Sequence, residues 1–217
     1  MTRGAADPTL SYVGPGMPRR TWLVRALATT LWLAVVLTGM TVLARYEGTP
    51  GATGEAPQDW PAATRVARGS GRHTIVMLAH PRCPCTRASL AELARLMTGA
   101  PREVDVRVLF VKPAGTEDGW EKTDLWRRAA AIPGVTVASD PDGREAARFG
   151  ATVSGQVVAY DAAGRLVFRG GITGGRGHEG DNVGRTRLAS LLKTGEADAR
   201  QSPVFGCALA APHSGRR

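Results

Sequence analysis

Hydrophobic positions form one long uninterrupted run near the N-terminus and a series of short, periodic runs further along the chain. Residues 26–44, ALATTLWLAVVLTGMTVLA, contain no charged side chain. A helix needs about 20 apolar residues to cross the hydrocarbon core of a bilayer. The pattern therefore predicts a transmembrane helix over residues 21–45.

Charges beside this run predict its orientation. Four basic residues precede it, whereas one basic and one acidic residue, Arg45 and Glu47, follow it. The four are Arg3, Arg19, Arg20 and Arg25. Because an excess of positive charge stays on the cytoplasmic side, we expect a single pass through the bacterial cytoplasmic (inner) membrane, with the C-terminal part extracytoplasmic.

A cleaved signal peptide is the alternative to a retained anchor. Val42 and Ala44 suit the small-residue positions before a cleavage site. The apolar run is longer than the roughly 7 to 15 residues of a signal peptide's apolar region, which favours an anchor. Either reading exports the rest of the chain.

The segments on both sides of the apolar run lack periodicity. Residues 1–20 carry Gly, Pro and polar residues and are predicted to be a disordered cytoplasmic N-terminus. Residues 46–71 are rich in Gly, Pro and Ala and are predicted to be a linker or a loosely packed lead-in.

From residue 72 onward, two periodicities alternate. Short runs rich in β-branched residues predict buried strands at 74–80, 104–111 and 135–139. Amphipathic or capped segments predict helices from Cys83 to Gly99, at 123–132, within 140–151 and at 184–192. Residues 156–170 read as a hairpin that turns at Asp161 to Gly164. This order predicts an α/β domain with a central mixed sheet and helices on both faces.

Charge narrows the range of partners. The net charge is +9, with 28 basic residues, which would suit nucleic acid. The arginines are scattered through every segment, however, and are not interleaved with aromatic residues as a base-stacking surface requires. We therefore expect no nucleic-acid partner.

The chemistry of the chain is concentrated in HPRCPCTRASLAEL, residues 80–93. Cys83 lies at the expected N-terminus of a helix, where free N–H groups, the helix dipole and the nearby Arg82 and Arg87 favour a thiolate. Such a thiolate attacks disulfides and is oxidised by peroxide. Cys83 is therefore the predicted nucleophile.

Two cysteines compete to pair with Cys83. A bridge to Cys85 would close a strained ring across Pro84 and be easily reduced. Cys207 follows the last predicted helix in a proline-containing tail and could return over the site as a resolving thiol, or simply anchor the C-terminus as a small buried residue.

The segment 80–93 resembles the strand-turn-helix site of the thioredoxin-like superfamily, and DPDGREAARFGA followed by VVAYDAAGRLVFRG resembles its later helix and hairpin. The resemblance spans roughly residues 72–195. It implies a three-layer thioredoxin-like domain, 72–196, followed by a tail, 197–217. RGHEGDN and PVFGC are further points of similarity to bacterial RedB-type thioredoxin-like proteins.

Two departures from the family accompany the resemblance. Its alignment places Thr86 where the second cysteine of the family stands, so Cys85 is out of register. Ser154-Gly155 occupies the place of the family's cis-proline, which by resemblance shapes the substrate site and keeps metals away from the thiols. This second departure weakens the reading as an ordinary reductase and favours metal binding.

Two functions are favoured, and a fold retained for non-enzymatic binding is a third possibility. The first is a membrane-anchored, extracytoplasmic thiol–disulfide oxidoreductase, acting on protein thiols, protein disulfides or a peroxide, without a diffusible cofactor. The alternative is a Cu(I) metallochaperone that uses Cys83 and Cys85 with His178 or Cys207. His178 lies in the glycine-rich loop 170–181 and is a candidate ligand, base or substrate contact; His80 is a weaker candidate of the same kind.

Overall fold

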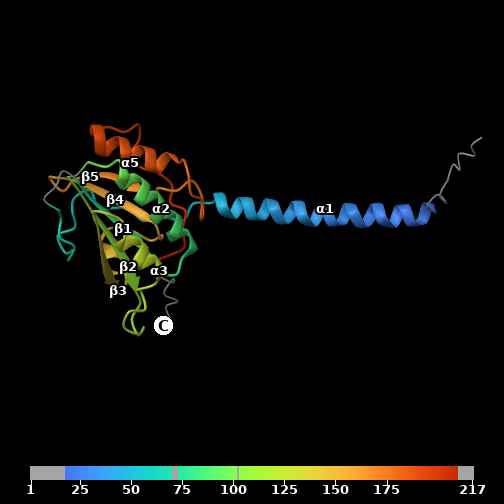
Figure 1. The fold of residues 1–217 in the computed structure, drawn as a ribbon, viewed down its shortest axis with the longest axis horizontal. Helices are drawn as coiled ribbons and strands as arrows, with labels where there is room; N and C mark the ends of the chain where they lie inside the picture. The colour runs from blue at the N-terminus through green and yellow to red at the C-terminus, as the bar shows by residue number, and fades with distance from the viewer. Residues whose placement is uncertain (1–17, 70–72, 102, 210–217) are drawn as a thin grey trace, which may run out of the picture. The chain divides into compact units, whose positions relative to one another are not determined.

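The computed structural model describes residues 18–69, 73–101 and 103–209. Its helices and strands alternate in the predicted order (Figure 1). They are α1 (Arg19–Gly48), β1 (His73–Ala79), α2 (Pro84–Thr98), β2 (Val104–Lys112), α3 (Asp124–Ala130), β3 (Val135–Pro141), α4 (Arg144–Arg148), β4 (Gln156–Asp161), β5 (Leu166–Gly170) and α5 (Val183–Thr194).

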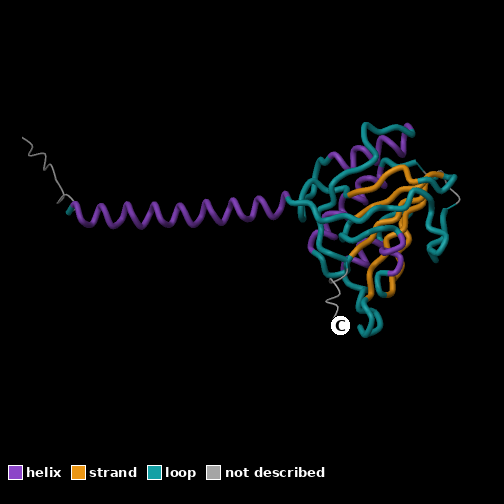
Figure 2. Tube along the Cα trace, turned by 180° about the vertical axis from the view of Figure 1, so that it is seen from behind, coloured by secondary structure: helices purple, strands orange, loops and turns teal. Residues whose placement is uncertain are grey.

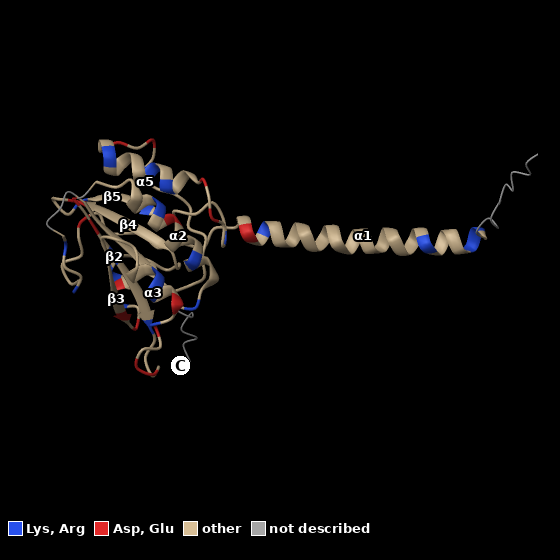
Figure 3. Ribbon diagram, in the orientation of Figure 1, with Lys and Arg blue, Asp and Glu red and all other residues tan. Residues whose placement is uncertain are grey.

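The chain divides into two compact units, the first of which ends at Ala44 and includes most of α1, while the second begins at Arg45 within the last turns of that helix. Helix α1 has 30 residues and is long and apolar enough to cross a membrane. Figure 3 shows its middle without charged residues, between basic residues at one end and a mixed pair at the other. The predicted long apolar helix is confirmed, as either an anchor or a signal.

The second unit is built on one mixed five-stranded sheet in the order β3-β2-β1-β4-β5 (Figure 2). Strand β1 is parallel to β2, and β2 is parallel to β3. Strand β4 is antiparallel to both β1 and β5. The parallel strands β1, β2 and β3 and the β4-β5 hairpin form one sheet, and α5 follows the hairpin in the chain. This is the arrangement of a thioredoxin-like fold, so the predicted fold class is confirmed.

The two faces of the sheet are covered differently. One face packs against α2, α3 and α5 in the larger apolar cluster, to which they contribute Leu93, Leu125 and Leu188. The other face carries α4 and irregular chain, including Trp60, whose ring lies 5.2 Å from the rings of both Phe149 and Tyr160. Every residue of β1 is buried, because the strand lies at the centre of the sheet with both faces covered.

The segment predicted to be a linker contacts the domain at several points. Gly51 N donates to Val204 O at 2.8 Å, and the Tyr160 hydroxyl donates to Pro57 O at 3.0 Å. Ala56 is buried. The predicted disordered segment 1–20 lies outside the described residues except for its last three, and the predicted boundaries at 72 and 196 remain predictions.

Candidate thiol site

The site lies where β1 ends and α2 begins. Cys83 is the N-cap residue, with extended φ and ψ of −95° and 123°, and Pro84 occupies the first turn of the helix. Proline suits this position because it lacks the N–H that the first turn leaves unpaired. The Cys83 sulfur is therefore held among the free N–H groups of a helix start.

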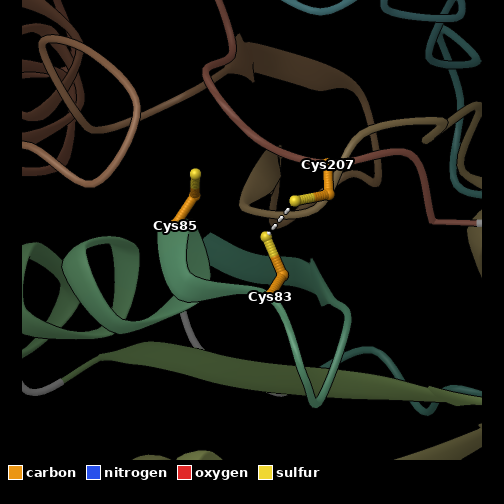
Figure 4. A group of neighbouring side chains, drawn as sticks. All are labelled: Cys83, Cys85 and Cys207. Carbon is orange, nitrogen blue, oxygen red and sulfur yellow. Dashed lines mark hydrogen bonds between the residues drawn. The ribbon is translucent and has the colours of Figure 1, made fainter. Parts of the chain in front are cut away.

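Three sulfur atoms meet here. The Sγ atoms of Cys83, Cys85 and Cys207 all lie within 4.8 Å of one another, and those of Cys83 and Cys207 are 2.8 Å apart. All three cysteines are free thiols. Figure 4 shows Cys83 and Cys207 pointing toward each other, while Cys85 rises from the helix beside them. The closest pair joins the helix start to the C-terminal tail.

Hydrogen bonds decide the charge of Cys83. Burial raises the pKa of its thiol, but the Cys207 thiol and the backbone N–H groups of Cys207, Thr86 and Cys85 all donate to the thiolate, and together they lower the pKa below its usual value. Donors aimed at the charged form favour that form. Cys83 is thus the cysteine of the cluster whose surroundings favour the thiolate form.

The other two thiols are shifted in the opposite direction. Burial, followed by the charge of Cys83, raises the pKa of Cys85, although the nearby Arg176 opposes this rise. Burial and the hydrogen bond to Cys83 raise the pKa of Cys207 to about 12. The arrangement pairs Cys83, whose pKa is lowered, with Cys207, whose pKa is raised and whose thiol donates to the Cys83 sulfur.

The tail that carries Cys207 pairs with the segment just before β4. Ser154 N donates to Cys207 O at 2.8 Å, and Leu209 N donates to Thr152 O at 2.9 Å. This segment contains Ser154-Gly155, which by the sequence resemblance stands where thioredoxin-like proteins carry a cis-proline. The tail therefore reaches Cys83 by forming an antiparallel β-bridge with the wall of the site.

The side chains of Thr86 and Ser154 form a closed ring of hydrogen bonds with the backbone of His80. His80 N donates to Ser154 Oγ at 2.8 Å, and the Thr86 hydroxyl donates to His80 O at 3.0 Å. The Ser154 and Thr86 oxygens are 2.8 Å apart. Because the Thr86 proton is used on His80 O, Ser154 donates to Thr86. Thr86, which stands in the register of a second cysteine, thus fixes the turn instead.

Arg176, in the glycine-rich loop, was not singled out by the sequence analysis. Its guanidinium donates from Nη1 to Gly206 O, next to Cys207, and from Nε to Tyr46 O at 3.2 Å. Its charge also opposes the rise in the pKa of Cys85 and Cys207. Arginines are scattered through the whole chain, so nothing in its local sequence marks this one.

The two candidate histidines occupy different surroundings. His178 is exposed, and the group of side chains that could hold a metal ion within the described part of the chain consists of the three cysteines without it. His80 is half-buried and packs edge-on against Trp120, and burial, followed by the charge of Arg82, lowers its pKa. A functional role for His178 stays a prediction.

A buried carboxylate connects α2 to the loop and to α5. Glu92 is fully buried and forms an ion pair with Arg185 at 2.7 Å. Gly180 N donates to it at 2.8 Å, and Asn182 Nδ2 donates at 3.3 Å. Glu92 thereby fixes the end of the loop that carries Arg176.

A small cavity of about 210 Å³ lies on the other side of Cys83. Its lining includes Arg82, Pro84 and the ion pair between Arg87 and Asp124, whose N–O distance is 2.8 Å. This cavity is the open space beside the buried sulfur that the structure offers to a small molecule.

No protein-family model and no curated protein matches the chain. An uncharacterised conserved protein from Geobacillus kaustophilus is 18% identical, covers 77% of this chain and 94% of its own, and has a TM-score of 0.56. A hypothetical protein from Sinorhizobium meliloti 1021 is 19% identical, with coverages of 74% and 93% and a TM-score of 0.53. An exposed lipoprotein thioredoxin from Streptococcus pneumoniae is 16% identical, with coverages of 64% and 98% and a TM-score of 0.43. The first two similarities establish the fold.

Proposed function

We propose that the protein is a membrane-anchored, extracytoplasmic thiol–disulfide oxidoreductase whose redox pair is Cys83 and Cys207. The observation that carries the proposal is the 2.8 Å distance between the Sγ atoms of Cys83 and Cys207. The pKa of the first thiol is lowered and that of the second is raised. A disulfide needs an S–S distance of about 2.05 Å, so a shift of less than about 1 Å closes the bridge.

The pairing with Cys207 follows from the helix start. Cys83 and Cys85 lie on one turn of a rigid element, separated by Pro84, and their side chains do not point at each other (Figure 4). A disulfide requires side chains that converge. Cys207 arrives from the opposite side on the tail and meets this requirement without any change in α2.

The reaction exchanges two electrons with a partner. In one direction, a partner dithiol is oxidised to a disulfide while the Cys83–Cys207 bridge is reduced to a thiolate and a thiol. In the other direction, a partner disulfide accepts the two electrons and the bridge forms. A protein thiol or disulfide is the proposed partner.

The proposed location rests on α1 and its charges. Basic residues precede the apolar run, and the positive-inside rule then leaves the thiol domain outside the cytoplasmic membrane of a bacterium. That compartment permits disulfides. The resemblance to RedB-type proteins belongs to the same proposal, as a sequence likeness.

Three single variants of the full chain test the redox pair. We expect Cys83→Ser to abolish the acceleration, over the uncatalysed rate, of the reduction of a disulfide-linked peptide by dithiothreitol, and Cys207→Ser to reduce that acceleration strongly. Cys85→Ser is the matched control and should keep most of the activity. Full activity of Cys207→Ser together with an inactive Cys85→Ser would assign the pair to Cys83 and Cys85 instead.

The spacing of the three sulfurs favours one second function, Cu(I) binding. Sulfurs within 4.8 Å of one another can converge on one ion, and thiolates are the ligands that Cu(I) prefers. Anaerobic titration of the reduced chain with Cu(I) should then give one tightly held ion, and Cys207→Ser should weaken its binding. Weak binding of less than one ion per chain would contradict this function.

A further inference from the structure

The two cysteines of the proposed pair differ in their exposure to solvent. Cys83 is 2% exposed, whereas Cys207 is partly exposed. A partner as large as a protein approaches a cysteine that lies at the surface more readily than one that is buried. The difference bears on which cysteine the partner attacks.

The tail that shields Cys83 is closely fitted. Gly206 lies so near the segment before β4 that a Cβ on it would be 2.0 Å from Ser154 O. Val204, Phe205 and Leu209 are buried on either side of it. Chain held by three buried apolar side chains does not open readily, so Cys83 stays covered while Cys207 remains at the surface.

We propose that partner thiols attack the bridge at Cys207, so that the mixed disulfide forms on the tail cysteine and not on the helix cysteine. This inference rests on the proposed function. A partner thiolate bonds to Cys207 Sγ, the Cys83–Cys207 bond breaks, and its electron pair leaves on Cys83 as a thiolate. A second partner thiolate then attacks the partner sulfur, forms the partner's disulfide and releases Cys207, which takes up a proton.

The chemistry of the leaving group agrees with this order. In thiol–disulfide exchange, the sulfur with the lower pKa leaves faster. The Cys207 S–H is absent from the bridge, but the backbone N–H groups of Cys207, Thr86 and Cys85, which also lower the pKa of Cys83, remain to stabilise its thiolate as the leaving group. Burial raises the pKa of Cys207. Arg176, beside the tail, also places positive charge where a partner thiolate would approach.

The cavity beside Cys83 defines the competing route. By this route a small thiol would enter the cavity, of about 210 Å³, and attack Cys83 instead of Cys207. The 2% exposure of Cys83 opposes this route. Attack at Cys83 would then leave Cys207 as the free thiol. The two routes place the mixed disulfide in different tryptic peptides, because Arg82, Arg87, Arg200 and Arg216 separate CPCTR from QSPVFGCALAAPHSGR.

Glutathione is the probe for the site of attack. The oxidised full chain is mixed with limiting reduced glutathione, quenched within seconds with N-ethylmaleimide and acid, and digested with trypsin for peptide mass mapping. We expect glutathione on the Cys207 peptide, at about ten times or more its amount on CPCTR. An equal or larger amount on CPCTR would overturn the inference.

A variant that lifts the tail provides the second measurement. Gly206→Ala should expose Cys83 and move glutathione toward CPCTR, because its Cβ cannot fit against Ser154 O. Gly99→Ala, where an added Cβ makes only ordinary contacts, is the matched control and should leave the distribution unchanged. An unchanged distribution in Gly206→Ala would contradict shielding by the tail.

Failure of the inference and failure of the proposed function are distinguishable. If oxidation leaves the intact mass unchanged and no Cys83–Cys207 bridge appears in the peptide map, both are wrong. If the bridge forms but glutathione is found on CPCTR, only the site of attack is wrong.

Discussion

The start of α2, which holds Cys83, and the C-terminal tail, which holds Cys207, place their sulfur atoms side by side but give them different surroundings. The helix start surrounds its sulfur with N–H donors and buries it, which favours a thiolate. The tail is held by glycine contacts and apolar side chains, and its cysteine is partly exposed and has a raised pKa. The helix start favours the charged form of Cys83, whereas the tail leaves Cys207 accessible to solvent.

The largest expected effect comes from the buried charge on the helix side. Glu92→Ala should lower the free energy of unfolding by about 3–5 kcal/mol, because it leaves Arg185 and the loop N–H groups without their buried partner. Urea unfolding of the full chain measures this loss. Glu196→Ala, at an exposed position, should change the value by less than about 0.5 kcal/mol. Equal values for the two variants would contradict the role of Glu92.

A smaller loss is expected on the tail side. Gly206→Ala forces the tail away from Ser154 O, and such overpacking costs about 1–3 kcal/mol. The same variant should slow closure of the Cys83–Cys207 bridge, measured by intact mass during oxidation. Gly99→Ala should affect neither quantity. Bridge closure at the normal rate in Gly206→Ala would show that the close fit does not position Cys207.

Breaking the hydrogen-bonded ring of Thr86, Ser154 and His80 should lower the free energy of unfolding by about 1 kcal/mol. Thr86→Val keeps the shape of the side chain but removes the hydroxyl that links His80 O to Ser154, leaving buried groups without a partner. Thermal unfolding should show the loss. Thr98→Val removes an exposed hydroxyl at the end of the same helix and serves as the control. A stability equal to that of the control would argue against the ring.

The pH dependence of stability tests whether Cys207 stabilises the thiolate form of Cys83. Because the pKa of Cys83 is lowered, its thiolate contributes stability above the ordinary thiol pKa of about 8.5, and this is lost as the pH falls through the lowered value. The ultraviolet absorbance of the thiolate should follow the same midpoint. Cys207→Ala removes a donor to the thiolate, so its midpoint should rise. A midpoint that stays unchanged would show that Cys207 does not stabilise the thiolate.

Much of the fold could be predicted because its signals are local. The β-branched run that became β1, the amphipathic spacing of Leu90, Leu93 and Met97 in α2, and the hairpin turn at Asp161 to Gly164 each depend on neighbouring residues. The Gly, Pro and Ala content of segment 46–71 indicates a linker, but its Trp60 packs on the rings of Phe149 and Tyr160, which lie far away in the sequence. Composition alone does not reveal such long-range contacts.

The residues of the site also differ in whether the local sequence marks them. Cys83 could be singled out from its place before a helix, but the partners of Thr86 and Ser154 lie far away in the chain, and nothing in the local sequence marks Arg176. His178, chosen for its place in a glycine-rich loop, is exposed, and the three thiols meet without it. A residue type at a suggestive place in a loop does not fix where its side chain lies.

By itself, the sequence determined the apolar helix, the order of strands and helices, and a thiolate-forming cysteine at a helix start, because periodicity and helix-end electrostatics act over a few residues. Only the tertiary structure decided which thiol faces Cys83. Cys85 is two positions away but shares a rigid turn, whereas Cys207 is 124 positions away and arrives through the path of the tail. Contacts of that kind depend on how the whole chain packs, and no local pattern records them.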